Sequence, residues 1–517
     1  MKSVMQHNFS VAPTADIPRS SFDRSHGYKT AFDAGYLVPI YVDEALPGDT
    51  LNMNPHIFAR MATPINPVMD NVFFDIHFFS VPMRQLWDNF RKFMGERVDP
   101  ADSIDFTMPV INAPVGGFAE ESLFDYLGMP IGIDGISMNA LFARAYNHIY
   151  NEWYRDQNLI DSVTLNTGNG PDADTDYSLL RRGKRHDYFT SCLPWLQKGD
   201  SVEIPLGTSA PVGPSSATSV TMTDGTDTRS IQANAGTNPV VGNLSWTTGG
   251  DLTFVQSGLE TDLSTATAAT INQLRQAFQI QKLLERDARS GTRYAEIVKS
   301  HFGVNFYDPS YRPEFLGGST TPVNVHPVPQ TSETPASGTP QGNLSAFATV
   351  GLDSGGFTKS FTEHCVVMGI ASVRADLTYQ QGINRMYSRS TRYDYFWPAL
   401  AHIGEQSIPN KEIYAQGTSA DDDVFGYQER YAEYKYKPSL ITGAFRSAAA
   451  TSLDNWHLSQ EFSSLPGLNQ TFIEENPPMS RVLAVSTEPH FIVDCYFKLM
   501  CARPMPLYSV PGLIDHF

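Results

Sequence analysis

Short runs of apolar and aromatic residues recur along the whole chain, separated by turn residues. Residues 36–42 (YLVPIYV) and 71–82 (NVFFDIHFFSVP) are two such runs near the start. Three later runs, at 365–373, 482–485 and 490–500, have the same character. Runs of this length and composition predict strands. Because they are scattered from one end of the chain to the other, they favour one β-sandwich with large insertions over a series of separate domains.

Helical periodicity is confined to a few segments. Residues 141–153 carry an apolar stripe at i, i+3/i+4 spacing, and shorter stripes occur at 86–93, 271–283 and 294–302. The segment 318–345 contains five prolines, which predict an irregular loop, since proline disrupts both helices and central strands. The expected fold class is therefore mainly β, with inserted helices and long loops.

Residues 201–270 differ from everything around them. This window holds 14 Thr, 9 Ser and 8 Gly, and its one basic residue is Arg229. It has too little large apolar surface to offset the entropy of ordering a sizeable core. Short apolar runs between turn residues still predict strands within it. We interpret it as a β-rich insertion that projects from a rigid body, where proteins often meet their partners.

Charge and composition narrow the possible functions. The chain has 517 residues and a net charge of −18, which argues against nonspecific nucleic-acid binding by the chain as a whole. Its four cysteines lie in apolar runs and predict buried thiols rather than a disulfide framework. The N-terminus does not resemble a secretory signal, and no stretch approaches the length of a membrane span. We expect a chain that is made in the cytosol and not inserted into a membrane.

Motifs for catalysis and metal binding are incomplete. Asp172, Asp174 and Asp176 copy the start of a calcium loop, but Tyr177 and Gly183 replace the glycine and glutamate that the loop needs. We find neither the nucleophile motif G-x-S-x-G nor the zinc motif H-E-x-x-H. The sequence therefore predicts no enzymatic activity, no metal site and no cofactor.

Two basic stretches are candidate contact sites. The first is the densest positive run in the chain, with the candidate DNA-facing residues Arg181, Arg182, Lys184 and Arg185. In the second, arginines alternate with aromatic residues, and the candidates are Arg385, Arg389, Arg392, Tyr393 and Trp397. Arginine with aromatic rings suits single-stranded DNA, and the same residue types are enriched at subunit interfaces. Both interpretations stay open, with the interface favoured for the second stretch.

Several longer stretches resemble the major capsid protein of gokushoviruses, small bacteriophages of the Microviridae. They cover nearly the whole chain except 201–270. The stretches are 17–30 (IPRSSFDRSHGYKT), 87–90 with 93–96, 180–190 (LRRGKRHDYFT), 285–289 with 299–303, 372–382 (SVRADLTYQQG) continuing to Arg392 and 404–406, and the closing segments 502–506 and 510–517.

The resemblance implies a single eight-stranded jelly roll of viral capsid type, formed by residues 1–200 and 271–517. It also implies a T=1 icosahedral shell that encloses circular single-stranded DNA and assembles in the cytoplasm of the host bacterium. Residues 201–270 would form a protrusion at the three-fold axis. The implied partners are further copies of the chain, an internal scaffolding protein, a DNA pilot protein and a small DNA-associated protein.

The insertion could also contact the host. Thr226, Arg229 and Trp246 are the candidate residues for a receptor or glycan surface on the protrusion. The alternative function is a jelly-roll protein that binds or hydrolyses carbohydrate, because the same fold also hosts lectins.

Overall fold

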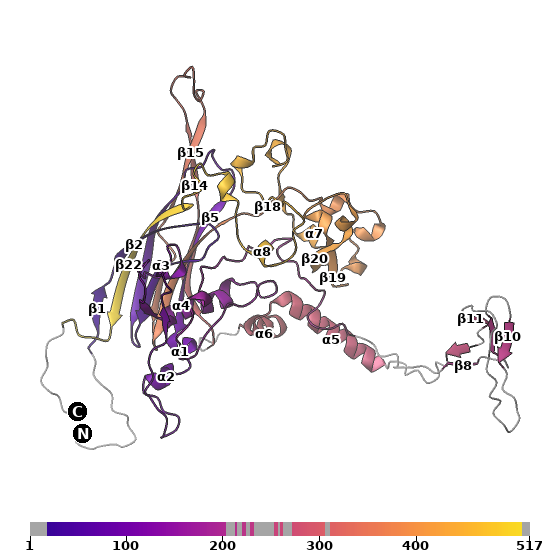
Figure 1. Ribbon diagram of the computed structural model, residues 1–517, viewed down its shortest axis with the longest axis horizontal. Helices are drawn as coiled ribbons and strands as arrows, with labels where there is room; N and C mark the ends of the chain where they lie inside the picture. The colour runs from indigo at the N-terminus through magenta and orange to yellow at the C-terminus, as the bar shows by residue number, and fades with distance from the viewer. Residues whose placement is uncertain are drawn as a thin grey trace. The chain divides into compact units, whose positions relative to one another are not determined.

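The structure is a computed structural model that describes residues 18–202, 212–214, 220–223, 228–231, 253–256, 259–261, 271–305 and 311–508 (Figure 1). The chain divides into two compact units, which are described separately. The main unit comprises residues 1–196 and 304–517, and the insert unit comprises residues 197–303. The insert unit is longer than the predicted insertion, because it includes two helices after residue 270.

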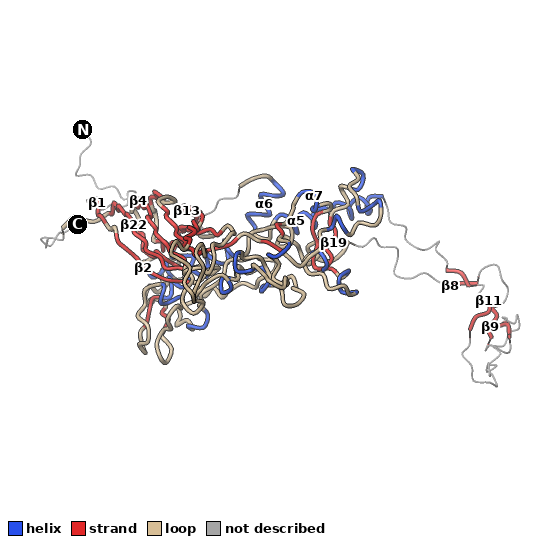
Figure 2. The backbone as a smooth tube through the Cα atoms, turned by 90° about the horizontal axis from the view of Figure 1, so that it is seen from above, coloured by secondary structure: helices blue, strands red, loops and turns tan. Residues whose placement is uncertain are grey.

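Seven antiparallel strands form the larger sheet of the main unit. Five follow one another in the order β1–β22–β4–β15–β14, while β2 also pairs with β22 and β16 with β4. Figure 2 shows β1, β2, β4 and β22 running together. The bounds are β1 Ser20–Asp23, β2 His26–Phe32, β4 Thr50–Met61, β14 Asn324–Pro329, β15 Leu344–Leu352, β16 Phe357–Ser360 and β22 Phe491–Arg503.

Four antiparallel strands form the smaller sheet, in the order β13–β5–β17–β3. Their bounds are β3 Val38–Ala45, β5 Val72–Pro82, β13 Glu314–Pro322 and β17 Cys365–Ala375. The two sheets share one hydrophobic core. Burial alternates strictly along β4, where Leu51 and Met53 are buried while Asn52 and Asn54 are exposed. This period of two is what a strand produces when one face packs on a core and the other meets solvent.

The opposite face of the smaller sheet packs against helices. Along β17, Val367 lies in the core between the sheets, while Val366 and Met368 lie in a second core with the helices. The strand is therefore buried on both faces and along its whole length. The helices of this layer are α1 Met83–Leu86, α2 Phe90–Phe93, α3 Leu123–Tyr126 and α4 Ala140–Ile149, and α4 continues as a π-helix over Tyr150–Tyr154. A short strand pair, β6 Val110–Asn112 and β7 Ser137–Asn139, lies in the same segment.

A third, smaller core belongs to the segment between β17 and β22. Its elements are β18 Thr378–Tyr379, β19 Glu405–Pro409, β20 Val424–Glu429, α7 Ala432–Lys435, β21 Ser439–Leu440 and α8 Gln470–Ile473. Tyr188 and Phe189, which follow the predicted basic run, pack into this core with Ile408 and Phe425. The packing joins two segments that lie more than 200 residues apart in sequence.

In the insert unit, β9 pairs with β10 and β11, and β8 pairs with β12. Its elements are β8 Val212–Pro214, β9 Val220–Thr223, β10 Thr228–Ile231, β11 Thr253–Gln256, β12 Leu259–Thr261, α5 Ile271–Ser290 and α6 Tyr294–Phe302. Among the described residues, no helix has the length and apolar character needed to cross a bilayer.

Two predictions of local structure are wrong. The segment 318–345 holds parts of three strands, because Pro322 ends β13 while Pro327 and Pro329 lie in β14, at the end of the sheet order. Proline is tolerated on an edge strand, where its missing N–H does not break a ladder on both sides. Residues 482–485 form no strand, and Leu483 makes only an isolated bridge to Pro64.

Candidate interaction surfaces

Two cations of the predicted DNA-facing run are held within the main unit. The Arg181 guanidinium lies 4.0 Å from the ring centre of Tyr36 and donates to the backbone carbonyl of Glu475 at 3.1 Å. Arg182 donates to the Asp75 carboxylate at 2.6 Å, and Arg374 reaches the same oxygen at 2.8 Å. Burial acts to raise the pKa of Asp75, but the charges of Arg182 and Arg374, with hydrogen bonds from Thr320 and Arg374, outweigh it and lower the pKa. Arg182 and Arg374 therefore stabilise the buried Asp75 carboxylate.

Lys184 is also engaged inside the fold. Its Nζ donates to the carbonyl of Phe472 at 2.5 Å and lies 4.8 Å from that residue's ring centre. The side chain is buried, and burial lowers its pKa against the opposing charges of Glu475 and Asp187. The next residue, Arg185, is exposed. Of the four predicted residues, Arg185 is thus the one that is exposed to solvent.

The second predicted stretch contributes to a surface rich in exposed rings, here called the aromatic surface. Tyr387 and Tyr393 lie in the 3₁₀ turns Arg385–Tyr387 and Arg392–Asp394. The other rings lie in the segment 395–397, which precedes a third turn at Pro398–Leu400, and in or just after α7. Exposed apolar clusters of this kind mark interaction sites. The members are between 49% and 76% exposed and comprise Tyr387, Tyr393, Tyr395, Phe396, Trp397, Tyr434 and Tyr436.

Arginines of the same chain cover several of these rings. The Arg389 guanidinium lies 4.4 Å from the ring centre of Tyr434 and 5.4 Å from that of Tyr395. Arg392 lies 4.8 Å from the ring centre of Tyr393 and donates to its hydroxyl at 2.9 Å. Trp397 donates its indole N–H to the Arg392 carbonyl at 2.8 Å. The structure therefore brings the predicted Arg389, Arg392, Tyr393 and Trp397 onto one surface.

Arg385 lies below this surface, among buried carboxylates. It is 3.2 Å from Glu412 and 4.0 Å from Glu433. The other Glu412 oxygen accepts a hydrogen bond from the Tyr188 hydroxyl at 2.8 Å. Burial raises the pKa of Glu412 to about 7, although Arg385 and the Tyr188 hydrogen bond act in the opposite direction. Sequence reasoning missed both glutamates, because neither belongs to a motif.

Of the three residues predicted for the receptor surface, Thr226 and Trp246 lie outside the described residues. Arg229 lies in β10, where its backbone pairs opposite Met222 of β9.

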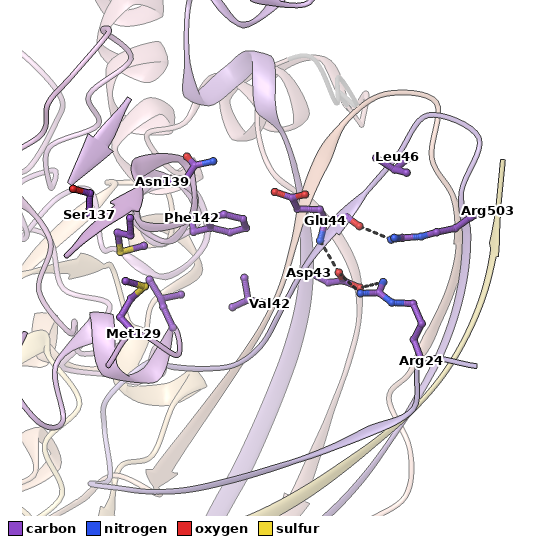
Figure 3. Close-up of a pocket in the computed structure, with 12 residues that line it drawn as sticks. Arg24, Val42, Asp43, Glu44, Leu46, Met129, Ser137, Asn139, Phe142 and Arg503 are labelled. Atoms are coloured by element: carbon purple, nitrogen blue, oxygen red, sulfur yellow. Dashed lines mark hydrogen bonds and ion pairs between the residues drawn. The ribbon is translucent and has the colours of Figure 1, made fainter. Parts of the chain in front are cut away.

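A pocket of about 540 Å³ lies beside β3 and α4 (Figure 3). Arg24 and Asp43 form a two-pronged ion pair on one side, with N–O distances of 2.5 and 2.9 Å. Arg503 donates to the Glu44 carbonyl at 2.7 Å. The opposite wall includes Met129 and Phe142 together with the polar side chains of Ser137 and Asn139 (Figure 3). Arg24, Asp43 and Arg503 are thus engaged in contacts within the fold.

The aspartates that copy the start of a calcium loop have other roles in the fold. Asp172 is fully buried and pairs with Arg144, so it is not available as a metal ligand. Within the described residues, no group of three or more histidine, cysteine or acidic side chains is placed to hold a metal ion. All four cysteines are buried and none of them forms a disulfide, which confirms the prediction of buried thiols.

Comparison with known proteins agrees with the sequence resemblance. The family model described as "Capsid protein (F protein)" matches residues 10–513. The chain is 47% identical to capsid protein VP1 of Bdellovibrio phage phiMH2K, over 99% of this chain and 98% of that protein. It is 44% identical to capsid protein VP1 of Chlamydia phage 1, with the same coverage, and 37% identical to that of Spiroplasma virus 4, over 98% and 97% of the two chains. The chain therefore belongs to the capsid protein (F protein) family of bacteriophages and is a structural component of the virion.

Proposed function

We propose that the chain assembles into a T=1 icosahedral shell, built on an eight-stranded jelly roll, around a circular single-stranded DNA genome. The proposed jelly roll is supported by the way its eight principal strands pair. Numbered along the chain as first to eighth, they are β2, β3, β4, β5, β13, β15, β17 and β22.

These eight strands pair as four nested antiparallel couples. The fourth pairs with the fifth, the third with the sixth, the second with the seventh and the first with the eighth. One long hairpin rolled into two packed sheets produces this nesting, and it is the arrangement of two Greek keys in a jelly roll. The remaining strands of the larger sheet, β1, β14 and β16, are additions to its edges and ends.

The insert unit falls within one connection, between β5 and β13. A connection can lengthen without changing strand order, which suits a variable surface element. We retain residues 201–270 as an outward protrusion at the three-fold axis, and Thr226, Arg229 and Trp246 as candidates for host attachment. The main unit would form the continuous shell. The predicted shell domain, 1–200 with 271–517, differs from it mainly by including α5 and α6, which belong to the insert unit.

For the aromatic surface, ring geometry favours a contact between subunits over a contact with DNA. Base stacking needs an open ring face. The faces of Tyr434, Tyr395 and Tyr393 are approached by Arg389 or Arg392 of the same chain. Aromatic rings and arginines held in fixed positions are instead typical of the anchors of protein interfaces.

Genome contact by the first basic stretch is proposed for Arg185, because Arg181, Arg182 and Lys184 are engaged within the fold. One exposed arginine gives weak binding to phosphate. A chain of net charge −18 therefore suits a shell that shares genome contact with a small basic DNA-associated protein. The internal scaffolding protein and the DNA pilot protein are proposed as further partners on the resemblance alone.

Expression of the chain with its viral partners and electron microscopy of the product tests the proposal. We expect closed shells of uniform size in which this chain is the main component. Recovery of the folded chain only as monomers, or its absence from the shell of mature particles, would overturn the proposal.

A further inference from the structure

Helix α5 carries an apolar seam that the described residues of the insert unit cover over only half its length. Heptad spacing from Ile271 places Leu274 and Phe278 on the same seam, followed by Gln281, Glu285 and Ala288. The first three side chains are 70%, 36% and 64% exposed, whereas Ala288 is buried. The uncovered part of the seam is thus its most apolar part.

Helix α6 accounts for the covered half. Its His301 lies 2.7 Å from Asp287 of α5, and its Ala295 is buried like Ala288. Helix α6 has nine residues and α5 has twenty, which correspond to about 13 Å and 30 Å. The shorter helix cannot span the longer one, and α5 and α6 are the only helices among the described residues of the insert unit.

An unsupported helical segment of ten residues is marginal in water. Its stability normally comes from burying an apolar face. The described residues of the insert unit leave the Ile271–Phe278 seam exposed, so a partner there would stabilise the first half of α5.

Charge indicates which partner fits. Arg275 is the one charged residue between 271 and 281, and the other polar residues there are amides. Identical helices that meet around a symmetry axis bring like residues together, so charged faces repel one another. A charge-poor apolar seam avoids this repulsion. A capsid protein also assembles with copies of itself, so each neighbouring copy brings an identical α5 seam that could pack against this one.

We infer that Ile271, Leu274 and Phe278 of α5 pack against the same helix of a second copy of this chain. The contact would make α5 an assembly element at the base of the insertion, and the inference rests on the proposed assembly into a shell. Two other occupants of the seam are possible: the preceding segment of the same chain, or another virion protein. With either of them on the seam, the test below would yield no covalent dimer.

Disulfide trapping in assembled particles tests the contact. Leu274→Cys and Phe278→Cys are introduced singly into the full chain, with Gln279→Cys as the matched control. Gln279 is exposed but lies about a quarter-turn or more away from the seam. The native cysteines are all buried, so a covalent dimer must form through the introduced thiols.

After mild oxidation, we expect roughly tenfold more covalent dimer for at least one seam variant than for Gln279→Cys, because a disulfide needs Cα atoms within about 7 Å. Particles that form normally without dimer enrichment in either seam variant would overturn the helix contact while leaving the shell proposal intact. Failure of the unmodified chain to form particles would overturn the shell proposal itself.

Discussion

Arg144 and Asp172 form an ion pair whose side chains are both fully buried, with Nε–Oδ2 and Nη2–Oδ1 distances of 2.7 Å. Arg144 also donates to the carbonyl of Leu86, and Tyr177 donates to Asp172 at 2.6 Å. The pair therefore fastens α4 to the loop that carries the aspartate cluster. What looks like the start of a calcium loop in the sequence is an internal anchor of the helical layer.

Removing one member of this pair should strongly destabilise the main unit. Arg144→Met leaves the Asp172 carboxylate buried and uncompensated, at an expected cost of about 3–5 kcal/mol. Arg91→Met is the matched control, because Arg91 pairs with Glu96 on the surface and its loss should cost at most ~1 kcal/mol. Urea denaturation of the two variants checks the difference. Equal stabilities would contradict the anchoring role.

The aromatic surface should contribute more to particle stability than to folding. Trp397→Ala removes a half-exposed ring, and loss of an interface anchor typically costs about 1–4 kcal/mol per contact. We expect particles of this variant to dissociate at a clearly lower urea concentration, while the unfolding midpoint of the free chain falls only slightly, because the ring makes one hydrogen bond within the chain. Val115→Ala, at a residue that is 99% exposed and outside this surface, serves as control. An unchanged dissociation midpoint for Trp397→Ala would exclude it from the interface.

Charge reversal separates the two parts of the basic run. Arg185→Glu should leave the shell intact and lower the DNA content of particles, because this side chain is exposed. Arg182→Glu should instead prevent folding, since it places a second carboxylate beside the buried Asp75. The ratio of absorbance at 260 and 280 nm of purified particles reports DNA content. Normal DNA content in the Arg185→Glu particle would refute genome contact at this site.

Stability around the third core should depend on pH through Glu412. Its pKa is raised from 4.5 to about 7, so the folded state holds this proton more tightly than the unfolded chain does. The stabilisation is fully present below the ordinary pKa and is lost as pH rises through about 7. Glu412→Gln, which mimics the neutral form, should flatten the dependence between pH 5 and 8. Thermal unfolding over this range measures it, and identical slopes in the two proteins would contradict the assignment.

Deletion of residues 201–270 tests whether the insertion is dispensable for the shell. None of the described residues of this segment belongs to the three hydrophobic cores. We expect shells to assemble and attachment to host cells to fall. Loss of assembly would instead make the segment an assembly element.

Much of the fold is predictable from local pattern. The runs at 71–82, 365–373 and 490–500 coincide with β5, β17 and β22, because a long β-branched and aromatic run has few alternatives to a strand. The stripe at 141–153 is confirmed as α4 and its π-helical continuation. The sequence pattern does not predict β4, although burial alternates strictly along it, because Pro55 interrupts the apolar run. The prolines of β14 conceal that strand in the same way.

The candidate sites were less predictable, because side-chain direction depends on tertiary packing. A dense basic run indicates charge, and nothing in it shows that Arg182 will meet Asp75, 107 residues away. Likewise, Glu412 and Glu433 belong to no motif and join Arg385 only after the chain folds back. The seam of α5 is visible in sequence, whereas its exposure is not.

We expect this capsid protein to form a closed shell from β-sandwich subunits whose principal strands pair as nested couples. Cryo-electron microscopy of particles purified from the expressed chain and its viral partners is the decisive measurement. We predict icosahedral particles in which each subunit shows β2–β22, β3–β17, β4–β15 and β5–β13 as paired strands, with the aromatic surface buried between neighbours. Particles whose shell lacks this chain, or subunits in which these pairs are absent, would contradict the account.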